Sequence, residues 1–183
     1  MSCSGFALFE TAIGRCGLAW GPDGLAGVQL PEASVAVTMA RLWRRFPGRE
    51  SAASPPDAAQ AIARITAFLA GAPDDFLDLE LDFAGVGEWD RSVYAAARAI
   101  PAGTTITYGA LAARLGDPAQ ARAVGQALAR NPWPILVPCH RITAAEGRTG
   151  GFSAPGGTAT KLKLLEIEGA LAAETLPLFR PSG

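Results

Sequence analysis

Apolar positions in the first part of the chain fall first into short runs and then into helical spacing. The runs at 6–9, 17–20 and 25–30 are separated by turn residues, which predicts a β-meander. Apolar residues then recur at helical spacing over 32–46 and 58–70, which predicts two helices joined by a linker of small residues. Apolar and mostly acidic positions alternate over 75–83, and this period of two predicts a further strand.

A second group of elements follows Gly85-Val86-Gly87, where we place a boundary. Apolar residues at helical spacing from Trp89 to Ile100 predict a helix that ends before Pro101. Thr107 is expected to cap a short helix that stops at Gly116, and Asp117-Pro118 to begin another that runs to about residue 130. Two helices joined by a tight turn containing glycine are typical of a helix-turn-helix.

The outer face of that last helix carries small residues around one long side chain. Ala121, Arg122 and Gly125 share this face at helical spacing. Such a face can approach a narrow minor groove closely and insert one side chain. Taken alone, the helix fits close packing against another helix slightly better, with Arg122 at the edge.

Composition restricts the class of protein. The 183 residues are 49% hydrophobic and 18% charged, which is typical of a compact core. We expect a cytoplasmic protein, because the sequence shows no membrane-spanning stretch and no secretory signal, and its three widely spaced cysteines form no disulfide framework. A single histidine and the lack of a CxxC pair argue against a zinc site.

The net charge of −1 averages two unlike parts. Residues 1–87 hold six Lys/Arg and ten Asp/Glu, whereas residues 88–170 hold nine and six. The second part is therefore mildly basic, which permits a surface that faces phosphate groups. An uneven scatter of solvated charges explains the difference equally well.

The strongest chemical candidate is Cys139, in the run Pro138-Cys139-His140-Arg141. A thiol reacts as a nucleophile when it is ionised, and a neighbouring histidine can accept its proton. Because adjacent side chains of a regular strand point to opposite faces, cooperation between the two requires a turn at Pro138-Cys139 or a bridging water. Glu166 and Glu168 are both candidates to orient the imidazole. Taken alone, a cysteine next to a histidine is more often structural than reactive.

These motifs together resemble the O6-alkylguanine-DNA alkyltransferases. The resemblance covers about residues 88–170 and is carried by the order and spacing of 106–112, 121–125, Asn131-Pro132, 138–141, 151–153, Leu164-Leu165 and Glu168-Gly169. Over residues 1–87 only the order of strands and helices agrees.

The resemblance implies an α/β fold with two domains. Residues 1–85 would form a ribonuclease-H-like domain with a small antiparallel sheet, and residues 86–170 a winged helix-turn-helix domain, followed by a tail at 171–183. It also implies direct-reversal DNA repair by a monomeric protein that uses no cofactor and no metal. A single-turnover methyltransferase of this kind flips an O6-alkylguanine, with O4-alkylthymine as a further substrate, out of double-stranded DNA and keeps the alkyl group on a cysteine.

The resemblance assigns a role to each matching residue. Cys139 would accept the alkyl group, His140 would act as base through a water, Glu168 would orient His140, and Asn131 would hold the turn. Glu168 is preferred to Glu166 because it precedes the matching glycine. The residues that would contact DNA or the lesion are Tyr108, Ala121, Arg122, Gly125, Arg141, Ile142 through its carbonyl, Phe152, and Ser153 through its amide.

Two departures from the family pattern affect the substrate pocket. The loop Ala154-Pro155-Gly156-Gly157 is about two residues longer than usual, and Phe152 stands where many members have tyrosine. Both leave the range of accepted alkyl groups open.

Three rival functions predict different behaviour. A helix-turn-helix regulator with a structural Cys139 would dimerise on a palindromic site, and a cysteine hydrolase would turn over and need an oxyanion site. A protein that only binds lesions is disfavoured, because the acceptor cysteine is present.

Overall fold

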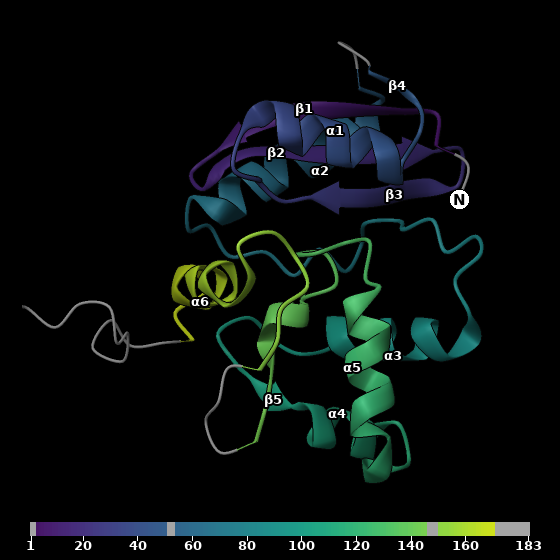
Figure 1. Ribbon diagram of the computed structural model, residues 1–183, viewed down its shortest axis with the longest axis vertical. Coiled ribbons are helices and arrows are strands. Elements are labelled where there is room, and N and C mark those ends of the chain that lie inside the picture. The colour runs from purple at the N-terminus through teal and green to yellow at the C-terminus, as the bar shows by residue number, and fades with distance from the viewer. Residues whose placement is uncertain (1–2, 51–53, 146–149, 171–183) are drawn as a thin grey trace, which may run out of the picture.

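The computed structural model describes residues 3–50, 54–145 and 150–170. Its N-terminal half is a four-stranded sheet in the order β3-β2-β1-β4 (Figure 1). Neighbours among the first three strands are antiparallel, as the predicted meander requires, whereas β4 is parallel to β1. The strands are β1 (Gly5–Thr11), β2 (Gly14–Gly21), β3 (Gly24–Gln29) and β4 (Arg49–Glu50).

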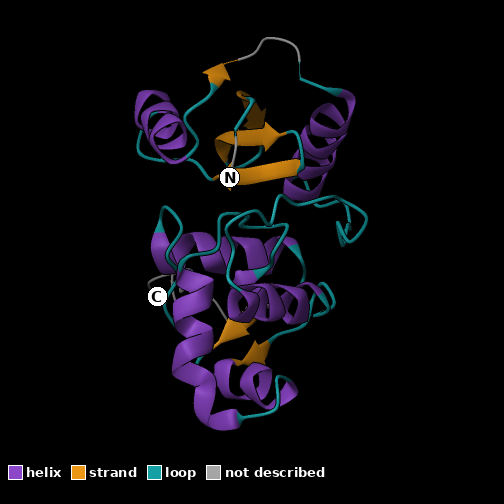
Figure 2. Ribbon diagram, turned by 90° about the vertical axis from the view of Figure 1, so that its right-hand side faces the viewer, coloured by secondary structure: helices purple, strands orange, loops and turns teal. Residues whose placement is uncertain are grey.

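The two predicted helices are confirmed as α1 (Val35–Arg45) and α2 (Pro56–Leu69), which cover opposite faces of the sheet (Figure 2). Alternation along β2 separates the faces: Leu18 and Trp20 pack in the cluster that contains α2, and Ala19 in the cluster that contains α1. The α1 face requires small residues. A Cβ at Gly27 would lie 2.0 Å from the Phe46 ring, so glycine lets the end of α1 approach the sheet.

The strand predicted over 75–83 is wrong. Apart from an isolated bridge between Leu81 and Leu25, this segment is a loop. Asp74 accepts a hydrogen bond from the Phe76 amide at 2.9 Å, and Phe76 has a φ of 54° that no strand permits. Leu77 is 51% exposed, so the apolar residues do not share one face.

The C-terminal half is mainly helical, and its caps are those that the sequence predicts. Thr107 Oγ1 accepts from the Ala110 amide at 3.1 Å, and Asp117 Oδ1 from the Ala119 amide at 2.9 Å. The elements are α3 (Glu88–Arg98), β5 (Ile106–Thr107), α4 (Tyr108–Arg114), the 3₁₀ helix η1 (Pro118–Gln120), α5 (Ala121–Ala129), the 3₁₀ helix η2 (Cys139–Arg141), β6 (Ile142–Thr143) and α6 (Gly157–Ile167). The short strands β5 and β6 pair in parallel.

The two halves are joined by hydrogen bonds from the loop after α5. Trp133 Nε1 donates to the Leu25 carbonyl at 2.6 Å, and the Val28 amide donates to the Pro132 carbonyl at 2.8 Å. This joint fixes the segment that leads to η2 against the sheet. Within the described residues, no helix is both long and apolar enough to cross a membrane. Positions 51–53 of the predicted linker and the tail at 171–183 lie outside the described residues.

Candidate functional site

Cys139 opens the 3₁₀ helix η2, so the chain turns at Pro138-Cys139, which is one of the two arrangements that the sequence left open. The side chain is buried but reaches a cavity, and it is 7% exposed. Asn131 holds the chain before it: its Nδ2 donates to the Val137 carbonyl and its Oδ1 accepts from the Trp133 amide, both at 2.9 Å. One side chain therefore fixes both ends of the segment 133–137, which leads to the thiol.

His140 is oriented by Glu168, one of the two candidates left open by the sequence. Their Nε2 and Oε1 atoms are 2.8 Å apart, and both side chains are almost fully buried. Glu166 is exposed and pairs with Lys163 instead. An ionised Glu168 can only accept, so the shared proton belongs on Nε2. His140 Nδ1 then carries a lone pair, and it has no hydrogen-bond partner among the described residues.

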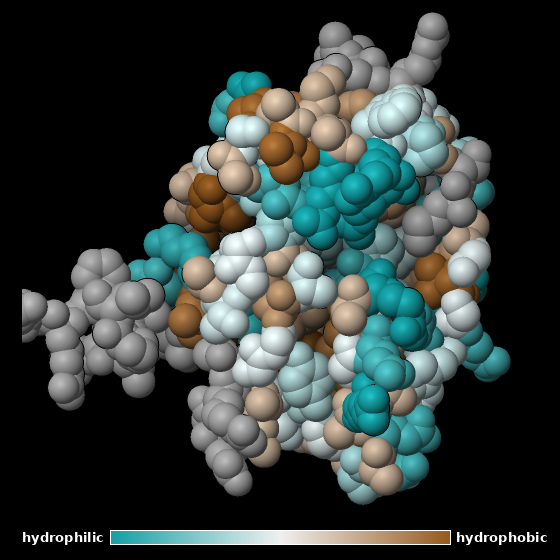
Figure 3. Space-filling model, viewed as in Figure 1, coloured by the Kyte–Doolittle hydropathy of each residue, from teal (hydrophilic) through white to brown (hydrophobic). Residues whose placement is uncertain are grey.

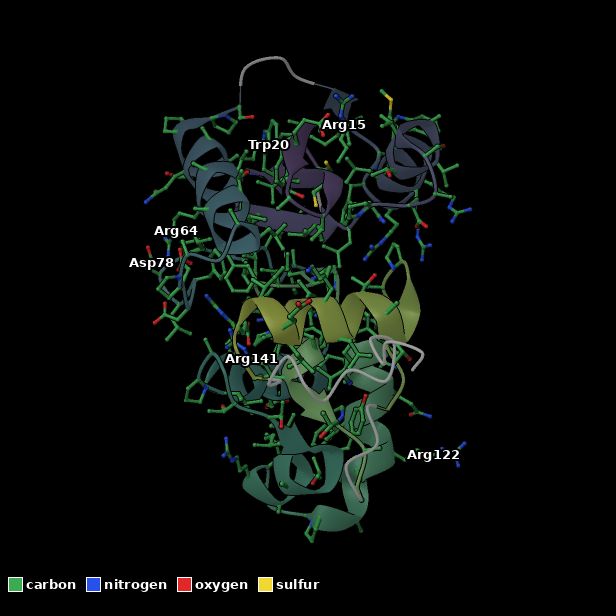
Figure 4. The ribbon with its side chains drawn as sticks, turned by 90° about the vertical axis from the view of Figure 1, so that its left-hand side faces the viewer. Arg15, Trp20, Arg64, Asp78, Arg122 and Arg141 are labelled. Carbon is green, nitrogen blue, oxygen red and sulfur yellow. The ribbon has the colours of Figure 1, made fainter. Side chains whose placement is uncertain are left out.

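Arg141 lies in the interior of the protein, whereas the resemblance implies that it contacts DNA or the lesion. It is 2% exposed and lies inside the protein below α6 (Figure 4). Its Nη2 donates to Glu168 Oε1 at 2.7 Å, and its Nη1 to the Ile100 carbonyl at 2.5 Å. Burial of a guanidinium requires such partners, so Arg141 holds Glu168 in place.

Burial and charge set the protonation of the site at rest. Burial raises the pKa of the Cys139 thiol, and burial also lowers the pKa of His140 despite the neighbouring carboxylate. For Glu168, burial would raise the pKa, but hydrogen bonds from His140 and Arg141 outweigh it and bring the pKa to about 2. The resting site therefore holds a neutral thiol, a neutral imidazole and an ionised carboxylate.

Lys161 is a member of the site that the sequence analysis missed. It is fully buried on α6, and its Nζ donates to the Ile142 carbonyl at 2.5 Å. Burial lowers its pKa to about 8, while the nearby Cys139 acts in the opposite direction. Its positive form would stabilise a thiolate at Cys139. Its burial could have been inferred from its spacing. Lys161 precedes Leu164 by three residues and Leu165 by four, which places all three on one face of the helix.

A cavity of about 300 Å³ lies in front of the thiol, within the size range of ligand pockets. Tyr108 and Gly125 form part of its wall, and Phe152 and Ser153 form another part. The Tyr108 hydroxyl donates to the Gly151 carbonyl at 3.2 Å. The cavity therefore brings together α4, α5, the loop before α6 and Cys139.

The helix α5 carries the predicted contact residues beside this cavity. Arg122 is exposed and extends away from the body of the protein (Figure 4), and Ala121 and Gly125 are half-buried. Hydrophilic side chains gather over α1 and along α5 on one face (Figure 3). Ile142 is buried, and its carbonyl, expected to read the guanine edge, already accepts from Lys161.

Comparison with known proteins shows the family of the chain. Residues 88–170 match the family described as 6-O-methylguanine DNA methyltransferase, DNA binding domain. The methylated-DNA–protein-cysteine methyltransferase of Methanothermobacter thermautotrophicus is 36% identical over 154 residues, which are 84% of this chain and 78% of that relative. A DNA base-flipping protein of Thermus thermophilus is 44% identical over 121 residues, 63% of this chain and 80% of its own length.

Solved structures extend the likeness to the fold. The OGT of Mycobacterium tuberculosis in complex with DNA superposes with a TM-score of 0.73 at 32% sequence identity. The match covers 91% of this chain and 93% of the other, so both halves are shared.

Proposed function

The chain belongs to the methylated-DNA–protein-cysteine methyltransferase family and is a direct-reversal DNA-repair protein, and we propose that Cys139 is the residue that takes the alkyl group from O6-alkylguanine. One observation carries this assignment. The thiol lines a cavity between α4, α5 and the loop before α6, and the adjacent His140 is oriented by a buried carboxylate. The helix-turn-helix regulator and the lesion-binding protein are not favoured, since neither gives this arrangement a purpose.

Access to the lesion requires the base to leave the duplex, because its alkyl carbon cannot be reached inside the base stack. Arg122 is suited to occupy the space left by the base, since it is long, charged and free of the protein surface. The small residues Ala121 and Gly125 let α5 approach the minor groove. Tyr108, at the cavity wall, is placed to contact the flipped base and its phosphate.

The transfer is a displacement at carbon. His140 Nδ1 accepts the thiol proton through one water, and the sulfur attacks the alkyl carbon as the carbon–O6 bond breaks. The electron pair of that bond passes to guanine, which takes up a proton at N1, so the thiol proton is conserved overall. The thioether is stable in water, and each molecule acts once.

We also propose that three residues, Ser153, Ile142 and Phe152, contact the flipped guanine. Ser153 lines the cavity, and its backbone amide is suited to bind O6, where negative charge develops. The Ile142 carbonyl has a second lone pair besides the one that faces Lys161. Phe152 supplies an apolar wall without the hydroxyl of a tyrosine.

We further infer two domains, at residues 1–85 and 86–170, and a monomer that acts in the cytoplasm. The parallel pairing of β4 with β1 supports a ribonuclease-H-like first domain. The order α4, η1 and α5 beside the β5–β6 pair supports a winged helix-turn-helix second domain.

The test is a duplex oligonucleotide with a single O6-methylguanine. We expect restored guanine, one methyl group on the Cys139 peptide by mass spectrometry, and no more than one equivalent repaired per protein. Cys139→Ala should bind the duplex without repair, whereas the matched control Cys3→Ala should repair normally. An intact lesion after long incubation with excess reduced protein would overturn the assignment.

A further inference from the structure

A second cavity, of about 320 Å³, adjoins the first at the thiol. Ala129, Cys139 and Ser153 line both. The second cavity extends to the N-terminal half, where Arg41 and Arg45 of α1 border it, and Ala154 and Pro155 of the long loop form another side. Cys139 therefore stands where two cavities meet.

The geometry of displacement gives the second cavity a purpose. Attacking sulfur, carbon and departing oxygen lie nearly in line, so any substituent on that carbon must point sideways from the line. With guanine in the first cavity, a substituent larger than hydrogen needs space beside the sulfur. The second cavity offers space that touches the same thiol.

The charge of the second cavity is one-sided. Arg41, Arg45 and Arg130 line it, and no Asp or Glu does. Arg41 pairs with Glu32 at 2.6 Å and Arg130 with Asp90 at 2.7 Å. Arg45 has no carboxylate within ion-pair distance among the side chains that the structure describes. Its Nη1 donates to the Gln29 amide oxygen at 3.3 Å, and its guanidinium lies over the Phe46 ring, 5.2 Å from the ring centroid.

We propose that the second cavity is a subsite for alkyl groups that end in a carboxylate, as in O6-carboxymethylguanine, and that Arg45 binds the carboxylate. The proposal rests on the function proposed above and names a substrate class for the same thiol. Arginine is suited to the role because its planar fork of donors matches a carboxylate.

The reaction keeps the same balance for this lesion. The Cys139 sulfur bonds to the methylene carbon, the bond from that carbon to O6 breaks, and guanine leaves with a proton at N1. The product on the protein is S-carboxymethylcysteine. The carboxylate itself does not react, and a nearby cation offsets its repulsion of the developing thiolate.

The state of Arg45 fits a site for an anion. Burial and repulsion from the neighbouring Arg41 both lower the pKa of Arg45, and no acidic side chain among those described offsets them as Glu32 does for Arg41. A bound carboxylate would relieve this repulsion. The other anion available is a DNA phosphate, which would contribute equally to the binding of every lesion.

The test compares three lesions in the same duplex: O6-methyl-, O6-carbamoylmethyl- and O6-carboxymethylguanine. The carbamoylmethyl group has nearly the shape of carboxymethyl without its charge. We expect Arg45→Gln to lower the second-order rate constant for the carboxymethyl lesion about fivefold, the size of a partly exposed ion pair, and to leave the other two nearly unchanged. Arg44→Gln is the matched control, because Arg44 is on the same turn of α1 but does not line the cavity.

Each outcome decides the proposal. An equal loss on all three lesions would assign Arg45 to the DNA backbone and overturn the subsite. Unchanged repair of the carboxymethyl lesion by Arg45→Gln would also overturn it. A wild-type protein that repairs only the methyl lesion would overturn it as well. If the wild-type protein repaired none of the three lesions, the proposed function itself would be overturned.

Discussion

At the scale of single residues, Glu168 connects the reactive pair to the protein interior. Its carboxylate receives hydrogen bonds from His140 and from Arg141, and all three side chains are buried. The cation neutralises the acid, and the acid fixes the imidazole with Nδ1 available as acceptor. The same group therefore stabilises the fold and prepares the proton acceptor, so stability and repair should change together when it is altered.

The low pKa of Glu168 predicts how stability depends on pH. Its folded value of about 2 lies below the ordinary value of 4.5, so its contribution is fully present above about pH 5 and is lost as the pH falls toward 2. The lowered pKa of His140 acts in the same direction below about pH 6.5. Glu168→Gln should cost on the order of 3–5 kcal/mol at pH 7, because it leaves the Arg141 charge buried without a partner.

Urea unfolding of Glu168→Gln and wild type from pH 7 to pH 3 measures this effect. The difference between the two proteins should shrink as the pH falls below 5, and the variant should repair more slowly at pH 7. Glu166→Gln, on the exposed side, should behave as wild type. A difference that stays constant with pH would show that Glu168 acts through packing alone.

The residues of the site were predictable to the extent that their signals are local in sequence. Cys139 and His140 are neighbours, and Glu168 stands at a position that the family pattern marks. Lys161 and Arg141 are charged, and residues of these types are usually exposed on the surface. Their burial depends on partners far along the chain, such as Ile100, 41 residues before Arg141. No local pattern contains that information.

At the scale of elements, α5 brings one cation to the face beside the cavity. Removal of the Arg122 side chain should slow repair of a duplex lesion on the order of tenfold, because unstacking a base costs a few kcal/mol and nothing else would fill the gap. Reaction of the Cys139 thiol with iodoacetamide should stay unchanged in Arg122→Ala. Single-turnover kinetics on the duplex, with Arg114→Ala as an exposed control, measures the difference.

If Arg122→Ala repaired the duplex lesion at an unchanged rate, Arg122 would have no role in base flipping. A parallel loss of thiol reactivity would point instead to a disturbed site, in which α5 has shifted against Cys139.

The elements themselves were predicted unevenly. Both N-terminal helices and the caps at Thr107 and Asp117 follow from local spacing and capping chemistry, and they are confirmed. Apolar and polar residues alternate over 75–83 as in a strand, but this segment does not pair along its length with a neighbouring strand. Arg64 binds Asp78 (Figure 4). It also binds Asp74, and Arg98 donates to the carbonyls of Phe76 and Leu77. Arg98 thus occupies backbone carbonyls that a neighbouring strand would need, while Arg64 binds acidic side chains in and beside the segment.

At the scale of the whole molecule, Trp133 joins the halves. It is fully buried, donates to Leu25 of the sheet, and contacts Phe83 and Tyr94 with ring centroids 5.1 and 5.9 Å away. Trp133→Phe should lower the free energy of unfolding by about 1–3 kcal/mol, because the Leu25 carbonyl loses its buried donor. It should also lower the urea m-value, since the halves would no longer unfold as one unit.

Tyr94→Phe is the matched comparison. Its hydroxyl donates to the Ala127 carbonyl at 2.9 Å, within the C-terminal half, so its loss should reduce stability without a change in m. Equal m-values for both variants would contradict the role of Trp133 as the joint.

The buried, protonated thiol has a consequence for how long the protein stays ready. Oxidants and stray electrophiles attack thiolates far faster than thiols, and burial keeps Cys139 in the thiol form even though it borders two cavities. A molecule that reacts only once gains nothing from a thiol that is always reactive. We therefore expect unused protein to resist oxidation and stray alkylation for a long time, and its thiol to become reactive when a substrate fills the cavity.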